Sequence, residues 1–133
     1  MPDPVIDAAT AARRRAHAPY SHFHVGAALR CADGSIHAGC NVENAAYPQG
    51  VCAEAGAISA MVLAGGRRIV EIVISGGGAK ACPPCGGCRQ KIREFATPDA
   101  VIRMVDGDGR LLLESTLGAL LPHSFGPEDL DPG

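Results

Sequence analysis

The segment CPPCGGC, which begins at Cys82, places the tightest constraint on how this chain can fold. Pro83 holds Cys82 extended, and Pro84 suits the first turn of a helix that we expect from about Cys85 to Phe95. Cys85 and Cys88 are then three residues apart on one face of that helix, close to its positively polarised N-terminus. Because this position favours thiolates, the pair is typical of half a zinc site, although a redox dithiol has the same spacing.

A second cysteine-containing segment, VCAEAG, supplies the other half of the predicted site. It opens another expected helix, from about Cys52 to the glycines that begin at Gly65. Two helix N-termini that meet would bring three thiolates together and leave a fourth tetrahedral position open, as in a catalytic zinc site. Water in that position can lose its proton near neutral pH, and Glu54 is placed to carry protons. Taken alone, Cys52 suits a small buried residue and Glu54 a helix-dipole partner, but the combination with Cys85 and Cys88 favours a site.

Hydrophobic periodicity and turn residues predict helices that alternate with strands along the chain. The expected helices cover about residues 5–16, 52–64, 85–95 and 115–122, and the expected strands cover residues 24–31, 35–40 and 68–76, with a further strand and turn in 100–113. Ser115 is the expected cap of the last helix. An opening hairpin followed by alternating helices and strands indicates a layered α/β domain with a mixed sheet.

Length and composition exclude several classes of function. A chain of 133 residues with 47% hydrophobic residues suits one domain, residues 1–133, and we expect only the tail from about residue 126 to be loosely ordered. A net charge of -2 gives no general attraction for nucleic acid or a membrane surface, and no apolar run approaches the ~18 residues of a membrane span. Six cysteines without a signal sequence are more typical of thiols or metal ligands than of disulfides, which indicates a cytoplasmic protein.

Four segments closely resemble the small zinc-dependent cytidine deaminases that act on free nucleosides, namely APYSHFHVGAAL, GCNVENAAYPQGVCAE, PCGGCRQ and LLPHSF. The resemblance implies a three-layer α/β/α domain with a mixed sheet of about five strands. It also implies one Zn²⁺ per subunit, held by Cys52, Cys85 and Cys88, with Cys82 as a bystander. The three-cysteine branch of the family is generally tetrameric, so a homotetramer is expected.

The resemblance further implies hydrolytic deamination of cytidine, deoxycytidine or both, as in pyrimidine salvage. Glu54 would protonate the ring nitrogen, take a proton from the water that attacks C4, and pass one to the departing ammonia. Asn41 and Glu43 match the pair that holds the ribose hydroxyls, and they alternate on an extended segment so that both side chains point to one side. From spacing alone, an Asx-type turn at Asn41 with a solvated Glu43 is equally compatible.

Three further residues match substrate contacts of the family. Phe23 matches an aromatic residue that packs on the nucleoside, and Ala53 matches a position whose backbone contacts the base. Phe125 matches an aromatic residue that covers the base bound by the adjacent subunit. Without the resemblance, Phe23 is typical of ordinary core, and Phe125 of a residue that pins the tail to its own domain.

The clearest departure from the family follows Glu54. Most three-cysteine relatives have Cys-Ala-Glu-Arg-Thr, whereas this chain has Ala55 and Gly56 after the glutamate. The missing arginine would offset thiolate charge at the zinc, and Arg89 is the candidate to replace it. The altered first turn leaves open a cytosine derivative other than cytidine as the substrate.

The sequence is also compatible with two other functions. Blasticidin-S deaminases share the Cys-Ala-Glu and Pro-Cys-x-x-Cys motifs and remove an amino group from a cytosine antibiotic. A structural zinc knot in an interaction module is the non-enzymatic alternative, with Cys82 as the fourth ligand. The open fourth position and Glu54 argue against the knot.

Overall fold

The computed structural model describes residues 2–130. The strands are β1 (Gly26–Cys31), β2 (Ile36–Cys40), β3 (Ile69–Ser75), β4 (Val101–Val105) and β5 (Leu111–Thr116). The helices are α1 (Pro4–Arg13), α2 (Ala53–Leu63), α3 (Gly86–Arg93) and α4 (Leu117–Leu120), with short 3-10 helices η1 (Tyr47–Gln49) and η2 (Pro127–Asp129).

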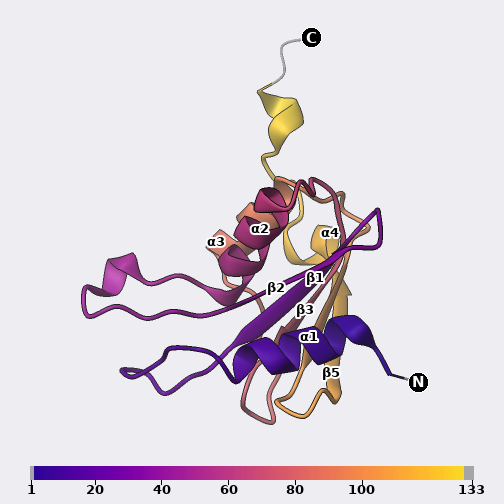
Figure 1. Ribbon diagram of the computed structural model, residues 1–133. Coiled ribbons are helices and arrows are strands. Elements are labelled where there is room, and N and C mark those ends of the chain that lie inside the picture. The colour runs from indigo at the N-terminus through magenta and orange to yellow at the C-terminus, as the bar shows by residue number, and fades with distance from the viewer. Residues whose placement is uncertain (1, 131–133) are drawn as a thin grey trace.

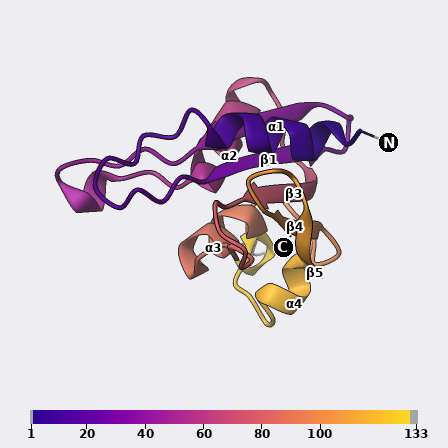
Figure 2. The same cartoon turned by 90° about the horizontal axis from the view of Figure 1, so that it is seen from below.

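The five strands form one mixed sheet in the order β2-β1-β3-β4-β5. The pair β3 and β4 is parallel and is connected through α3, whereas the other neighbouring strands are antiparallel. Helices cover both faces of the sheet, and Figure 2 shows α1 and α4 on opposite sides of the strands. The expected three-layer α/β/α fold with a mixed sheet is therefore confirmed.

One face of the sheet is covered by α1, which lies in front of the strands in Figure 1. Its N-terminus is capped by Asp3, whose Oδ1 accepts hydrogen bonds of 3.0 Å from the Val5 amide and 3.2 Å from the Ile6 amide. The buried residues of this layer are Val5, Ala9, Ala28, Val73 and Val105.

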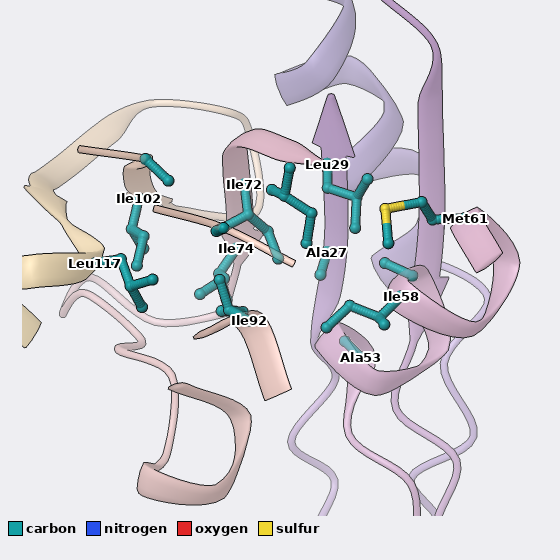
Figure 3. Close-up of a cluster of buried hydrophobic side chains, with 14 of the residues drawn as sticks. Ala27, Leu29, Ala53, Ile58, Met61, Ile72, Ile74, Ile92, Ile102 and Leu117 are labelled. Atoms are coloured by element: carbon teal, nitrogen blue, oxygen red, sulfur yellow. The ribbon is translucent and has the colours of Figure 1, made fainter. Parts of the chain in front are cut away.

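The opposite face carries the larger core and the two helices that begin with cysteines. In Figure 3, Met61 of α2 lies beside Leu29 of β1, and Ile92 of α3 lies beside Ile74 of β3. All four side chains are fully buried. Packing of α2 and α3 on one face, next to each other, brings their N-termini to the same end of the sheet.

Two segments, residues 14–25 and 41–52, project together from that end of the sheet (Figures 1 and 2). They are tied to each other by a parallel bridge between His17 and Val42, and the second segment is closed on itself by an antiparallel bridge between Val42 and Val51. The second segment leads directly into α2.

Two local expectations were wrong. The last helix is capped by Thr116, whose Oγ1 accepts a 3.2 Å hydrogen bond from the Ala119 amide. Ser115 instead lies in β5, where it pairs with Ile102 of β4. Pro84, which was expected in the first turn of α3, instead precedes the helix, because Cys85 is the N-cap residue. Within residues 2–130, the structure has no helix with the length and apolarity needed to cross a membrane.

Candidate active site

Three cysteine side chains meet where α2 and α3 begin. Cys52 is the N-cap residue of α2, Cys85 is the N-cap residue of α3, and Cys88 follows in the first turn of α3. Their Sγ atoms all lie within 4.8 Å of one another. Cys88 is buried, whereas Cys52 and Cys85 are exposed on the open side. The structure thus brings together the three predicted ligands from segments that are distant in the sequence.

The three thiols differ in acidity because their surroundings differ. The hydrogen bond from the Cys88 amide lowers the pKa of the Cys85 thiol, as expected at a helix N-terminus. Burial raises the pKa of the Cys52 thiol and that of the Cys88 thiol, because the thiolate form loses hydration there. Three sulfurs this close, two of which are poorly ionised by themselves, fit the thiolate donor set that zinc takes in proteins.

Glu54 lies in the first turn of α2 with only 5% of its surface exposed. Burial raises the pKa of its carboxyl group. A carboxyl group with a raised pKa is suited to both accepting and returning a proton near neutral pH. Its position two residues after Cys52 places it beside the sulfur cluster.

The cysteines and Glu54 open into one cavity of about 300 Å³. Its lining residues are Phe23, Val25, Asn41, Cys52, Ala53, Glu54, Cys82, Pro83, Cys85 and Cys88. The predicted substrate residues Phe23, Asn41 and Ala53 are therefore on this cavity, as is Cys82. Val25 and Pro83 were not expected there, although Val25 lies two residues after Phe23 on an extended segment and so faces the same side.

Cys82 lines the cavity but stays outside the sulfur cluster. The cluster found among residues 2–130 consists of Cys52, Cys85 and Cys88. Cys82 packs partly buried at the edge of the core, where burial raises the pKa of its thiol. A four-cysteine structural knot is not favoured by this arrangement.

Asn41 fastens the segment that carries Phe23. Its Oδ1 accepts a 2.9 Å hydrogen bond from the Val25 amide, and its Nδ2 donates a 2.8 Å hydrogen bond to the Phe23 carbonyl. These bonds join the end of β2 to the start of β1 and leave the aromatic ring 49% exposed at the cavity. This structural role of Asn41 could not be predicted from the spacing of residues along the sequence, because its hydrogen-bond partners lie 16 and 18 residues away.

Glu43 lines a second cavity, of about 340 Å³, and not the one that holds the cysteines. Its Oε1 accepts hydrogen bonds from the amides of Tyr20 (3.0 Å) and Ser21 (3.1 Å). The hydrogen bonds from Ser21 are the main cause that lowers the pKa of Glu43. The structure therefore places Asn41 and Glu43 on two different cavities.

Phe125 and Arg89 lie apart from the cavity lining of their own chain. The Phe125 side chain is 57% exposed. Arg89 donates from Nε to the Pro84 carbonyl and from Nη1 to the Leu120 carbonyl, each at 2.8 Å. These bonds hold the loop before α3 against the end of α4, so two of its donors serve the backbone instead of the cysteine sulfurs.

Fold and site together define a zinc-type hydrolase of the deaminase class, and the comparisons agree. Residues 3–104 match the model of the cytidine and deoxycytidylate deaminase zinc-binding region, so the chain belongs to the cytidine and deoxycytidylate deaminase family. It is 39% identical over 127 residues to the cytidine deaminase of Halalkalibacterium halodurans, which covers 96% of each chain. The cytidine deaminase of Mycobacterium tuberculosis is 38% identical, over 92% of this chain and 87% of that protein.

A solved structure gives the same result. The crystal structure of cytidine deaminase from Burkholderia pseudomallei is 40% identical and superposes with a TM-score of 0.85 over 92% of this chain and 97% of that chain. The resemblance read from the four sequence segments is therefore confirmed.

Proposed function

We propose that this protein is a zinc-dependent cytidine deaminase that converts cytidine, deoxycytidine or both, with water, to the uracil nucleoside and ammonia. One observation carries the proposal, the buried Glu54 carboxyl group on the same cavity as three clustered cysteine sulfurs. The names of the relatives support the choice of substrate. Membership of the family disfavours the structural knot, and the antibiotic alternative becomes an arm of the test below.

Cys52, Cys85 and Cys88 would hold one zinc ion per chain. When bound, zinc supplies a Lewis acid that makes a water molecule acidic enough to attack at neutral pH. The raised pKa of Cys52 and that of Cys88 mean that binding the metal displaces protons from these thiols.

Glu54 moves the protons of the reaction. Its carboxylate takes a proton from the attacking water, whose oxygen bonds to C4 of the base, and delivers one to the neighbouring ring nitrogen. Glu54 then takes the second proton from the new hydroxyl group on C4 and hands it to the exocyclic amino nitrogen, as the bond between C4 and this amino nitrogen breaks and ammonia leaves. Burial suits the carboxyl group to this task, because it raises the pKa and makes the protonated form easier to reach than it would be in water.

The remaining cavity residues would orient the nucleoside. Phe23 packs on it, the backbone of Ala53 contacts the base, and Asn41 and Glu43 accept or donate to the ribose hydroxyls. Support comes from the position of Phe23, Asn41 and Ala53 on one cavity, whereas Glu43 lies on a separate cavity and is assigned by its place in the sequence, two residues after Asn41. Oε1 of Glu43 already accepts two backbone hydrogen bonds, but a carboxylate has further acceptor positions to offer a hydroxyl group.

A homotetramer in the cytoplasm, in which Phe125 covers the base held by the adjacent subunit, completes the proposal. Support comes from several large apolar side chains that one chain leaves exposed, including Tyr47 at 76% and Phe125 at 57%. Six free cysteines suit a reducing compartment, and the product suits pyrimidine salvage. Mixed oligomers of Phe125→Ala and Glu54→Gln chains should recover active sites with the KM of the unmodified protein, which neither variant has alone, and verified mixed oligomers without any such sites would contradict the assignment.

The proposed function is tested by metal analysis together with ammonia release from cytidine, deoxycytidine and blasticidin S. We expect zinc in the purified protein and ammonia from one or both nucleosides. Ammonia from blasticidin S alone would replace the substrate, and zinc without ammonia from any of the three would favour the structural alternative.

A further inference from the structure

Helix α3 carries, beyond its cysteines, two side chains that hold the C-terminal segment, residues 124–129. Nε2 of Gln90 donates a 2.8 Å hydrogen bond to the Phe125 carbonyl. Nε of Arg93 donates a 2.8 Å hydrogen bond to Oγ of Ser124, and its Nη2 forms an ion pair with Glu128. The segment is thereby fastened on both sides of Phe125. In Figure 1, η2, which belongs to this segment, lies near the C-terminus and away from the sheet.

The guanidinium group of Arg93 also packs directly against Gly126. A Cβ atom at Gly126 would stand 2.4 Å from Cζ and from Nη2 of Arg93, so an alanine there would push the guanidinium group aside. Gly126 is buried, while its neighbours Phe125 and Pro127 are exposed. The Arg93 side chain is only 12% exposed, which is the environment of a structural contact and not of a solvated surface arginine.

This arrangement fixes the backbone and leaves the aromatic ring free. The Phe125 side chain keeps 57% of its surface exposed although the carbonyl of the same residue is hydrogen-bonded to α3. An exposed aromatic side chain on an immobilised backbone is pre-organised for contact with another surface, because the cost of ordering the segment is met before the contact forms.

We infer that Arg93 is a positioning residue for substrate binding, which acts by holding residues 124–129 on α3 so that Phe125 is presented to the neighbouring subunit's cavity. The inference rests on the proposed function, in which Phe125 covers the nucleoside. It goes further by naming the residue that sets the position of the ring. Because α3 also carries Cys85 and Cys88, one helix then serves the metal site of its own subunit and the substrate cavity of the next.

The test is a double-mutant cycle on the zinc-loaded protein with cytidine as the substrate. Arg93→Ala should raise KM about three- to tenfold and change kcat less than about twofold, because a contact that covers the nucleoside is made in ground state and transition state alike. Phe125→Ala should raise KM at least as much. Arg93→Ala added to Phe125→Ala should raise it no further, because Arg93 acts only through Phe125.

Two further variants keep the test sharp. Gly126→Ala displaces the guanidinium group while leaving Arg93 in the chain, so it should reproduce the KM effect even where Arg93→Ala folds poorly. Arg67→Ala is the matched control. Arg67 and Arg93 line the same surface cavity, but Arg67 donates hydrogen bonds to the Val62 and Gly66 carbonyls and not to residues 124–129. It should leave KM unchanged. Faster hydrogen exchange of the amides in residues 124–130 should accompany Arg93→Ala and Gly126→Ala.

The possible outcomes distinguish a failure of the proposed function from a failure of the inference about Arg93. No ammonia from cytidine with the unmodified protein would overturn the proposed function, and an unchanged KM in Phe125→Ala would overturn the assigned part of Phe125. A raised KM in Phe125→Ala with an unchanged KM in both Arg93→Ala and Gly126→Ala would overturn only the inference. If Arg93→Ala raises KM by the same factor in the Phe125→Ala background as in the unmodified protein, Arg93 acts independently of Phe125 and the inference is overturned.

Discussion

Gly39 of β2 lies so close to α2 that a Cβ atom on it would stand 2.3 Å from the amide nitrogen of Ala57. The same atom would be 2.7 Å from the Ala53 carbonyl oxygen. Both contacts are to helix backbone, which cannot move aside as a flexible side chain can. This approach seats the first turns of α2, and with them Cys52 and Glu54, against the sheet.

Gly39→Ala should therefore lower the free energy of unfolding by about 3 kcal/mol or more, since overpacking against backbone forces the helix away. Gly56→Ala is the matched control on the other side of the contact. Its Cβ atom would meet Gly39 at an ordinary 3.5 Å, so the higher helix propensity of alanine should stabilise the protein by up to about 1 kcal/mol. Chemical denaturation measures both, and equal effects of the two changes would contradict this packing argument.

Glu54→Gln should keep zinc and lose roughly two to four orders of magnitude in kcat, because an amide cannot exchange the proton. Steady-state ammonia release and metal content measured on the same preparation check this. Near-normal turnover with zinc retained would remove Glu54 from its assigned role.

Cys82→Ser should retain zinc, whereas Cys85→Ser and Cys88→Ser should lose it. The reason is geometric, since the sulfur cluster comprises Cys52, Cys85 and Cys88, with Cys82 beside it on the cavity wall. Metal content per chain after dialysis against a weak chelator is the measurement. Equal zinc loss in all three variants would revive a four-cysteine site.

Ala55→Arg should tighten zinc binding and move the acidic limb of the pH–rate profile to lower pH. Zinc with three thiolates carries a net charge of about -1, and a guanidinium group on the sulfurs would offset it and make the metal a stronger Lewis acid. Chelator competition and pH–rate measurements check the two effects. If both stay unchanged while a crystal structure shows the arginine on the sulfurs, the site is already balanced by the backbone amides of the two helix N-termini.

Asp3→Asn should lower the free energy of unfolding at pH 7 by about 1 kcal/mol, through loss of the ion pair with Arg103 at 2.8 Å. Asparagine still caps α1, so the change isolates the charge. The hydrogen bond from Arg103 lowers the pKa of Asp3, and a lowered pKa gives stability that is present above the unfolded-state value and lost as pH falls through the folded-state value. The difference between the two proteins should vanish at the acid end of a pH series of denaturation curves, and a constant difference would contradict it.

The sequence by itself determined the parts of the site that depend on neighbours along the chain. A three-residue spacing within one helix turn puts Cys85 and Cys88 on one side, and the prolines and glycines around them mark where that helix begins. The hydrophobic pattern likewise predicted the layers, because helix and strand periods are local properties. Ser115 shows the limit of that approach. It was expected to cap a helix, but it lies in β5 and pairs with Ile102 of β4, which is a contact between strands.

Only the tertiary structure decided which groups share a cavity and how each is solvated. Asn41 and Glu43 are two residues apart, yet packing places them on different cavities. Cys52 sits at a helix N-terminus that should lower its pKa, but burial raises it, and burial depends on everything that packs around the residue. The hold of Arg93 on residues 124–129 joins side chains 31 and 35 residues apart, a separation that only the path of the folded chain can close.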